Sequence, residues 1–250
     1  MKITKFIKDK NNKYKLIIDD EEYKLYEDTI IDYNLLSKKD ITQKELNDIL
    51  VADSKLTAYY DSIKYINIRI RSEKEIREYL KKKDISSEVI DKTIKLLYEN
   101  NFLNEELYLK SFINDKINLS MDGPIKIKRD LINLGLDSND IDSYLDNLDN
   151  SIWIDKIDSI VSKKINNNAK YSSYNLKNKL LLYLVNLGYN REDVSSIISR
   201  YDIIDNDIYK KERDKAYKEL SKKYSGYELE QKVNMRLYRK GFKGSDRYEE

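Results

Sequence analysis

The side chains in this sequence that could take part in chemistry are carboxylates, lysines, tyrosines and serines. The 250 residues include no histidine and no cysteine, which excludes a Ser-His-Asp triad, a thiol nucleophile, a Cys/His zinc site and any disulfide. The carboxylates of Glu73, Glu75 and Glu78 are spaced closely enough to suggest Mg²⁺ ligands. However, no P-loop or G-x-G-x-x-G motif accompanies them, and basic residues stand at helical spacing from Glu73 and Glu78. We therefore expect a binding protein without a cofactor rather than an enzyme.

Charge is distributed unevenly along the chain, although 47 basic residues nearly balance 45 acidic ones. The segment 64–83 carries eight basic and three acidic residues, whereas 137–158 carries seven aspartates and one lysine. The chain becomes basic again from Lys232 onward. Abundant Lys, Ile, Asn and Tyr are typical of an AT-rich genome, so the ten arginines are better functional candidates than the lysines.

These basic clusters provide a set of candidate contact residues. We expect them to form one concave surface that faces DNA phosphates or an acidic protein surface through nonspecific, salt-sensitive contacts. The alternative is that they are solvated helix faces with i, i+4 pairs such as Glu73–Arg77 and Glu78–Lys82. The candidates are Arg71, Arg77, Lys81, Lys82, Lys83, Lys126, Lys128, Arg129, Arg236, Arg239 and Lys240.

The elements that must position these residues change in type near residue 40. Alternating apolar and polar residues in the first 35 positions predict two or three short antiparallel strands that pack on the following helices. From about residue 42 the apolar residues recur with a period of 3.6. Thr42 and Glu45 have the spacing of a capping box, which predicts a long helix that continues to about Ile70.

The helical region contains an internal repeat. When Gly188 is aligned with Gly241, the segments share the pattern Y-S-[SG]-Y-x-L-x-x-K-[LV]-x-x-x-L-x-x-x-G-[YF] at an offset of 53 residues. Shorter versions begin at Ser72 and Gly123. In each copy an N-terminal cap, an i, i+4 apolar stripe and a closing Gly or Asp predict a helix that ends in a left-handed cap.

An amphipathic helix precedes each copy and another follows the first three, so the repeating unit is predicted to have three helices. This indicates a mainly α protein: tandem three-helix units in an elongated, curved array, preceded by a small antiparallel β segment. The predicted divisions are 1–40 (β-rich extension), 41–100 (linker helix and first unit), 101–150 (second), 151–204 (third) and 205–250 (partial fourth).

The repeat motifs resemble those of a known family. Arg71-Ser72-x-x-Glu75-Ile76-Arg77-x-Tyr79-Leu80 is similar to the hallmark motif of RecX, the bacterial regulator of the RecA recombinase. Residues 101–108, 123–136 and 232–242 resemble further RecX stretches in the same order, and 17–35 resembles the β extension of the longer Gram-positive members. The resemblance covers nearly all of the chain.

The resemblance implies a partner of the RecA–DNA filament that modulates, and most often inhibits, strand exchange, ATP turnover and co-protease activity in DNA repair and the SOS response. It also implies weak DNA binding without sequence specificity. The alternative is a helical-repeat DNA-binding or scaffolding protein unrelated to RecA. The longest apolar run, residues 180–185, is too short for a membrane span or signal peptide, so we expect a cytoplasmic, monomeric protein.

Overall fold

The N-terminal part of the computed structural model, which describes residues 1–10 and 12–243, is a three-stranded antiparallel sheet in the order β1-β2-β3. The strands are β1 (Ile3–Lys8), β2 (Lys13–Ile18) and β3 (Glu21–Tyr26). Ile18 pairs with Glu21 across a two-residue turn in which Asp19 and Asp20 both have positive φ angles, of 46° and 69°. Aspartate tolerates this left-handed backbone, so the turn fits the twist of the strands.

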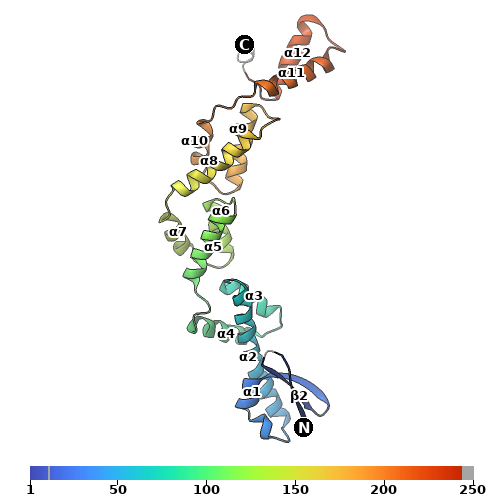
Figure 1. Cartoon of the computed structure of the whole chain (residues 1–250), viewed down its shortest axis with the longest axis vertical. Coiled ribbons are helices and arrows are strands. Elements are labelled where there is room, and N and C mark those ends of the chain that lie inside the picture. The colour runs from blue at the N-terminus through green and yellow to red at the C-terminus, as the bar shows by residue number, and fades with distance from the viewer. Residues whose placement is uncertain (11, 244–250) are drawn as a thin grey trace. The chain divides into compact units, whose positions relative to one another are not determined.

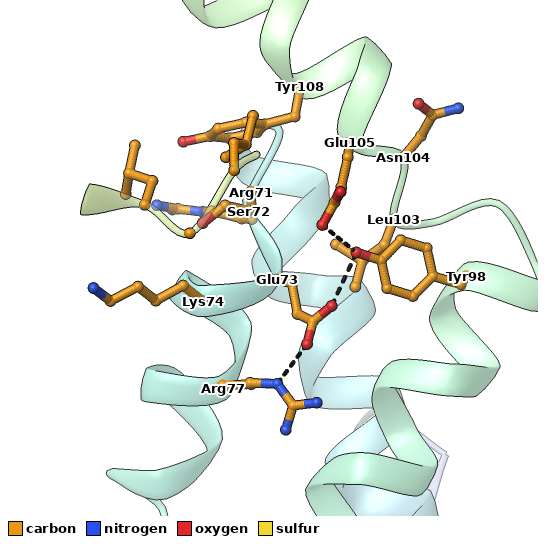
Figure 2. Close-up of a pocket in the computed structure, with 13 residues that line it drawn as sticks. Arg71, Ser72, Glu73, Lys74, Arg77, Tyr98, Leu103, Asn104, Glu105 and Tyr108 are labelled. Atoms are coloured by element: carbon orange, nitrogen blue, oxygen red, sulfur yellow. Dashed lines mark hydrogen bonds and ion pairs between the residues drawn. The ribbon is translucent and has the colours of Figure 1, made fainter. Parts of the chain in front are cut away.

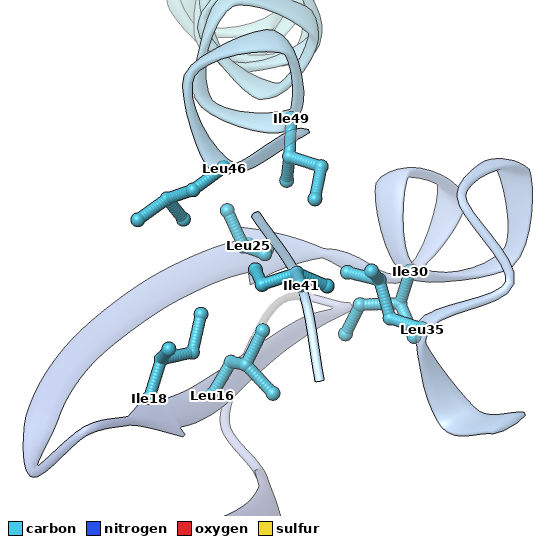
Figure 3. Close-up of a cluster of buried hydrophobic side chains, with 8 residues drawn as sticks. All are labelled: Leu16, Ile18, Leu25, Ile30, Leu35, Ile41, Leu46 and Ile49. Carbon is cyan, nitrogen blue, oxygen red and sulfur yellow. The ribbon is translucent and has the colours of Figure 1, made fainter. Parts of the chain in front are cut away.

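The sheet packs on helices, as its alternating pattern predicts. Its inward side chains join residues of the short helix α1 (Glu27–Asp32), the 3-10 turn Leu35–Ser37 and the long helix α2 (Gln43–Ile68) in one apolar cluster (Figure 3). A three-stranded sheet has too little buried surface to be stable alone, and this cluster provides it. The buried members are Leu16, Ile18, Leu25, Ile30, Leu35, Ile41, Leu46 and Ile49.

Helix α2 connects two cores. Its N-terminal half packs on the sheet, while Ala58 and the apolar residues after it pack on α3 (Glu73–Lys81) and α4 (Ser87–Glu99). The carboxylate of Asp53 is buried between the two cores, where it accepts hydrogen bonds of 2.7 Å from the backbone N–H of Tyr26 and the hydroxyl of Thr29. These bonds hold the start of α1 against α2, because a buried carboxylate that lost its hydrogen-bond donors would be strongly destabilising.

The described residues divide into two compact units, one formed by the first 111 positions with 134–136, the other by 112–133 and 137–243. The helices after α4, coloured from green to red in Figure 1, recur in the predicted order of threes. The mainly α fold class with a small antiparallel sheet is thus confirmed. The helices are α5 (Glu105–Leu119), α6 (Pro124–Asn133), α7 (Ser138–Asp146), α8 (Ser151–Asn166), α9 (Ser173–Asn186), α10 (Arg191–Ser199), α11 (Asn206–Leu220) and α12 (Gly226–Arg239).

The second helix of each three-helix unit, namely α3, α6, α9 and α12, is followed by a residue with left-handed backbone. Asp84, Gly135, Gly188 and Gly241 have φ angles of 58°, 94°, 91° and 85°. The predicted left-handed caps are therefore confirmed, and aspartate serves in the place of glycine at residue 84. The capping boxes Thr42–Glu45 and Ser72–Glu75 are also present.

Within the second compact unit, the second helices of successive three-helix repeats, α6, α9 and α12, are joined head to tail. At the start of α6, the N–H groups of Gly123 and Ile125 donate to the carbonyls of Leu187 and Gly188 at the end of α9, at 2.7 and 3.0 Å. Because helix N-termini lack acceptors and C-termini lack donors, each end satisfies the other.

A second head-to-tail joint follows in the same unit. Side chains at the start of α9, the hydroxyl of Ser172 and the amide of Asn175, donate to the carbonyl of Lys240 at the end of α12, at 2.9 and 2.6 Å. The approach is close, because a Cβ atom on Gly241 would lie 2.6 Å from the Ser172 hydroxyl. The glycine caps of α9 and α12 therefore end these helices and also leave room for the start of the second helix of the preceding three-helix unit.

Candidate partner and nucleic-acid interface

Arg71, the first of the candidate contact residues, lies inside a stack of side chains between α2 and α3. Its guanidinium lies 3.8 Å from the ring centroid of Tyr65, and that ring stacks on Tyr79 at 4.2 Å with the planes only 10° apart. The ammonium group of Lys83 lies 4.8 Å from the ring centroid of Tyr79. Only 9% of the Arg71 side chain is exposed. We assign Arg71 a structural role, because its charge is not available to a partner.

The carboxylate of Glu75 is held by a network of donors next to Arg71. It accepts a hydrogen bond from the Ser72 backbone N–H at 3.0 Å and from the Tyr108 hydroxyl at 3.2 Å. It also pairs with Arg69 at 2.5 Å and Arg71 at 3.3 Å. Burial by itself would raise the pKa of Glu75, but the Ser72 N–H and the two arginines hold it below its ordinary value.

A polar cavity of about 210 Å³ opens beside this network in the first unit (Figure 2). The Tyr98 hydroxyl donates to Glu73 and Glu105 at 3.0 Å each, and Arg77 donates to the other oxygen of Glu73 at 2.6 Å. Burial and these carboxylate partners raise the pKa of Tyr98. The cavity is lined by Arg71, Ser72, Glu73, Lys74, Arg77, Tyr98, Leu103, Asn104, Glu105, Tyr108 and residues 134–136.

The contacts of Glu73 and Glu75 bear on their suggested role as metal ligands. Both carboxylates are occupied by arginine and tyrosine donors. In the part of the chain that the structure describes, no group of three or more acidic side chains is arranged to hold a metal ion. We therefore read the two glutamates as residues that fix α3 to its neighbours.

Six further candidates form ion pairs with acidic residues, which lowers the charge that they offer to a partner. Arg77 pairs with both Glu73 and Asp91 at 2.6 Å. The predicted i, i+4 pair Glu73–Arg77 is therefore present, whereas the pair Glu78–Lys82 is not found among the described residues. The other five pairs cross between elements or span a helix start: Lys83 with Asp61, Lys126 with Asp122, Lys128 with Asp142, Arg236 with Glu219, and Lys240 with Glu212.

Four candidates, Lys81, Lys82, Arg129 and Arg239, are exposed and have no ion-pair or hydrogen-bond partner for their side chains among residues 1–10 and 12–243. They lie on or immediately after the second helices α3, α6 and α12. Lys82 and Arg239 each stand two residues before the left-handed cap of their helix, so they occupy equivalent repeat positions. Lys81 and Lys82 belong to the first compact unit, and Arg129 and Arg239 belong to the second.

Half-buried tyrosines that contact lysines form a class of residue outside the predicted set. Lys179 lies 4.7 Å from the ring centroid of Tyr171, and Lys232 lies 5.5 Å from that of Tyr224. Both pairs occur at the same positions of the 53-residue repeat. The repeat pattern pairs these positions, but the candidate set was drawn from basic residues alone.

Tandem three-helix units with capped, head-to-tail second helices define a helical-repeat protein. The model for the first three-helix domain of RecX matches residues 58–97, which cover the end of α2, α3 and most of α4. Among the described residues no helix has the length and apolar character needed to span a membrane.

Relatives and solved structures agree with that match. The regulatory protein RecX of Streptococcus agalactiae serotype III is 34% identical over 98% of this chain and 96% of its own. That of Lactococcus lactis subsp. cremoris MG1363 is 30% identical over 90% and 87%. A crystal structure of RecX from Lactobacillus salivarius has a TM-score of 0.55 and 26% identity, covering 61% of this chain and 99% of that one. The chain belongs to the RecX family.

Proposed function

We propose that the protein binds the RecA–DNA filament and inhibits its recombinase, ATPase and co-protease activities, acting in the cytoplasm during DNA repair and the SOS response. Its similarity to regulatory proteins named RecX, at 34% identity over 98% of the chain, carries this proposal. The protein acts as a regulator and not as an enzyme, because its active contribution is a binding surface. The RecA filament is its principal partner, and it binds DNA weakly without sequence specificity.

The unpaired cations on the second helices support a role in that binding. Lys81, Lys82, Arg129 and Arg239 are exposed and unneutralised within the described residues, so they can approach phosphates or an acidic protein surface. Contacts of this kind position a protein on DNA without reading its sequence, and salt weakens them. The remaining candidates contribute less, because ion pairs or burial occupy them.

Reversing two adjacent charges tests this proposal. We expect the double substitution Lys81→Glu and Lys82→Glu to weaken binding to RecA-coated single-stranded DNA by about tenfold or more, because each reversal replaces an attraction with a repulsion. The matched control is Lys210→Glu with Lys211→Glu, which reverses an exposed, adjacent pair on the first helix of a unit, α11. Binding is measured by fluorescence anisotropy at low salt.

The same assay separates the proposed function from the alternative of a DNA-binding protein unrelated to RecA. We expect RecA-coated DNA to be bound more tightly than bare duplex. Equal binding to the two would contradict the RecA assignment, whereas equal losses in the two charge-reversed proteins would contradict only the assignment of Lys81 and Lys82.

A further inference from the structure

An exposed lysine lies between two exposed tyrosines at the joint of α9 and α12. The ammonium group of Lys243 is 3.6 Å from the ring centroid of Tyr174 on α9 and 6.0 Å from that of Tyr238 on α12. The two tyrosines are 47% and 62% exposed. The head-to-tail joint at Lys240 brings them together, because it seats the start of α9 on the end of α12.

The exposure of these rings is not explained by packing. Tyr189 and Tyr209 in the same unit are 1% and 8% exposed, which is the state expected of a tyrosine that stabilises a core. Tyr174 and Tyr238 instead present ring surface to solvent. A flat, exposed ring is a surface on which a planar ligand can stack.

The lysine between these rings is not neutralised by an acidic residue. Within the described part of the chain, Lys243 contacts the rings of Tyr174 and Tyr238, and no ion pair with a carboxylate is found for it. In the same C-terminal segment, Arg236 and Lys240 are paired with Glu219 and Glu212. A cation that rests on an aromatic face keeps its full charge, so it remains available to an anion.

Exposed rings beside unneutralised cations match the two chemical parts of a single nucleic-acid strand. Unpaired bases stack on aromatic side chains, and the phosphates between them take the cations. A duplex cannot use the rings, since its bases are already stacked inside.

We propose that Tyr174, Tyr238 and Lys243 form a binding site for single-stranded DNA, in which bases stack on the two rings while Lys243 and Arg239 contact phosphates. The choice of DNA rests on the proposed function. The site itself requires no RecA, so it is tested with the free protein.

The test measures binding of a labelled oligothymidylate of about 20 nucleotides, which exceeds the site size of typical single-strand-binding folds. We expect Tyr174→Ala with Tyr238→Ala to lower the affinity by about tenfold or more. Tyr174→Phe with Tyr238→Phe keeps both rings and is expected to retain the affinity. Tyr217→Ala, which removes an exposed tyrosine of α11, serves as the matched control.

Three outcomes would overturn the site: an alanine double variant that binds as tightly as the unaltered protein, a phenylalanine double variant as weak as the alanine one, or tighter binding to a duplex of the same length. Circular dichroism of each variant verifies that it is folded. RecA ATPase assays run in parallel keep the two proposals separate. Wild-type protein that binds the oligonucleotide but never inhibits RecA supports the site while it contradicts the proposed function.

Discussion

At the scale of single residues, charge in this chain is used mainly to hold helices together. Arg71 is enclosed by Tyr65 and Glu75, and Arg77 is held by two carboxylates on two helices. Such buried or paired arginines stabilise a structure only while their partners remain, since removal of a partner leaves a desolvated charge. Glu75 is therefore the residue whose loss should affect this region most.

Replacement of Glu75 by Gln tests the network through its pH dependence. The pKa of Glu75 is held below its ordinary value of 4.5, so the ionised carboxylate stabilises the fold above about pH 4.5, and this contribution is lost as the pH falls through the lowered pKa. We expect Glu75→Gln to reduce the free energy of unfolding at neutral pH by about 1–3 kcal/mol. The variant should also lose less stability than the unaltered protein as the pH falls below about 4.5.

Urea unfolding at several pH values measures both effects. Glu78→Gln is the matched control, because Glu78 lies on the same helix, is exposed and has no side-chain partner among the described residues. If both variants show the same change in stability and the same pH profile, Glu75 does not hold the network.

Gly188 is the second residue whose replacement has a definite prediction. Its φ angle is 91°, and a Cβ atom there would collide with the backbone nitrogen of Lys126 at the start of α6. We expect Gly188→Ala to reduce the free energy of unfolding by about 2–4 kcal/mol, because backbone strain and a steric clash add. Chemical denaturation provides the measurement.

Gly226→Ala separates the two causes. Gly226 also has a positive φ angle, 58°, but no atom within 4 Å of an added Cβ, so the cost should be limited to backbone strain of about 1–2 kcal/mol. Equal destabilisation by the two alanines would show that the contact between α6 and α9 is not tight.

At the scale of elements, the second helices organise the repeat, because the ends of α9 and α12 each receive the start of another second helix. The joint between α9 and α12 depends on side chains, since Ser172 and Asn175 donate to the carbonyl of Lys240. The joint between α6 and α9 depends on backbone groups. Side-chain substitution can therefore weaken the first joint selectively.

The substitution Asn175→Ala is expected to loosen α12. It removes a 2.6 Å hydrogen bond to Lys240, which should lower stability by about 1–2 kcal/mol and increase amide hydrogen exchange in α11 and α12 more than in α6. Asn186→Ala, an exposed position on the same helix, is the control. Unchanged exchange in α12 after loss of Asn175 would reject the role of this bond.

At the scale of the whole molecule, the sequence was sufficient to predict the helical repeats and their caps. The same i, i+4 stripe and closing Gly or Asp recur four times, and each local signal agrees with the next. Helix α1 was missed, because it has only six residues and no side-chain N-cap. The divisions at residues 40, 100, 150 and 204, the curved array and the monomeric state stay predictions.

The candidate site was harder to predict, because contacts between residues far apart in the sequence decide which of its basic side chains are paired. The pair Glu73–Arg77 is visible as i, i+4, but Arg77–Asp91, Lys83–Asp61 and Lys240–Glu212 join residues 14, 22 and 28 positions apart. Sequence spacing gives no sign of such pairs. The structure thus divides the eleven candidates into held and unpaired cations, and whether they share one concave surface stays a prediction.

The ATPase activity of RecA on single-stranded DNA, titrated with this protein at substoichiometric ratios, tests the central claim most directly. A regulator that binds along a filament should affect many RecA subunits per molecule. We therefore expect the hydrolysis rate to decrease already at ratios of less than one molecule of this protein per RecA subunit. The decrease should be smaller with the double variant Lys81→Glu, Lys82→Glu. An unchanged rate at about tenfold excess of the folded protein, well beyond saturation for any micromolar affinity, would contradict the account.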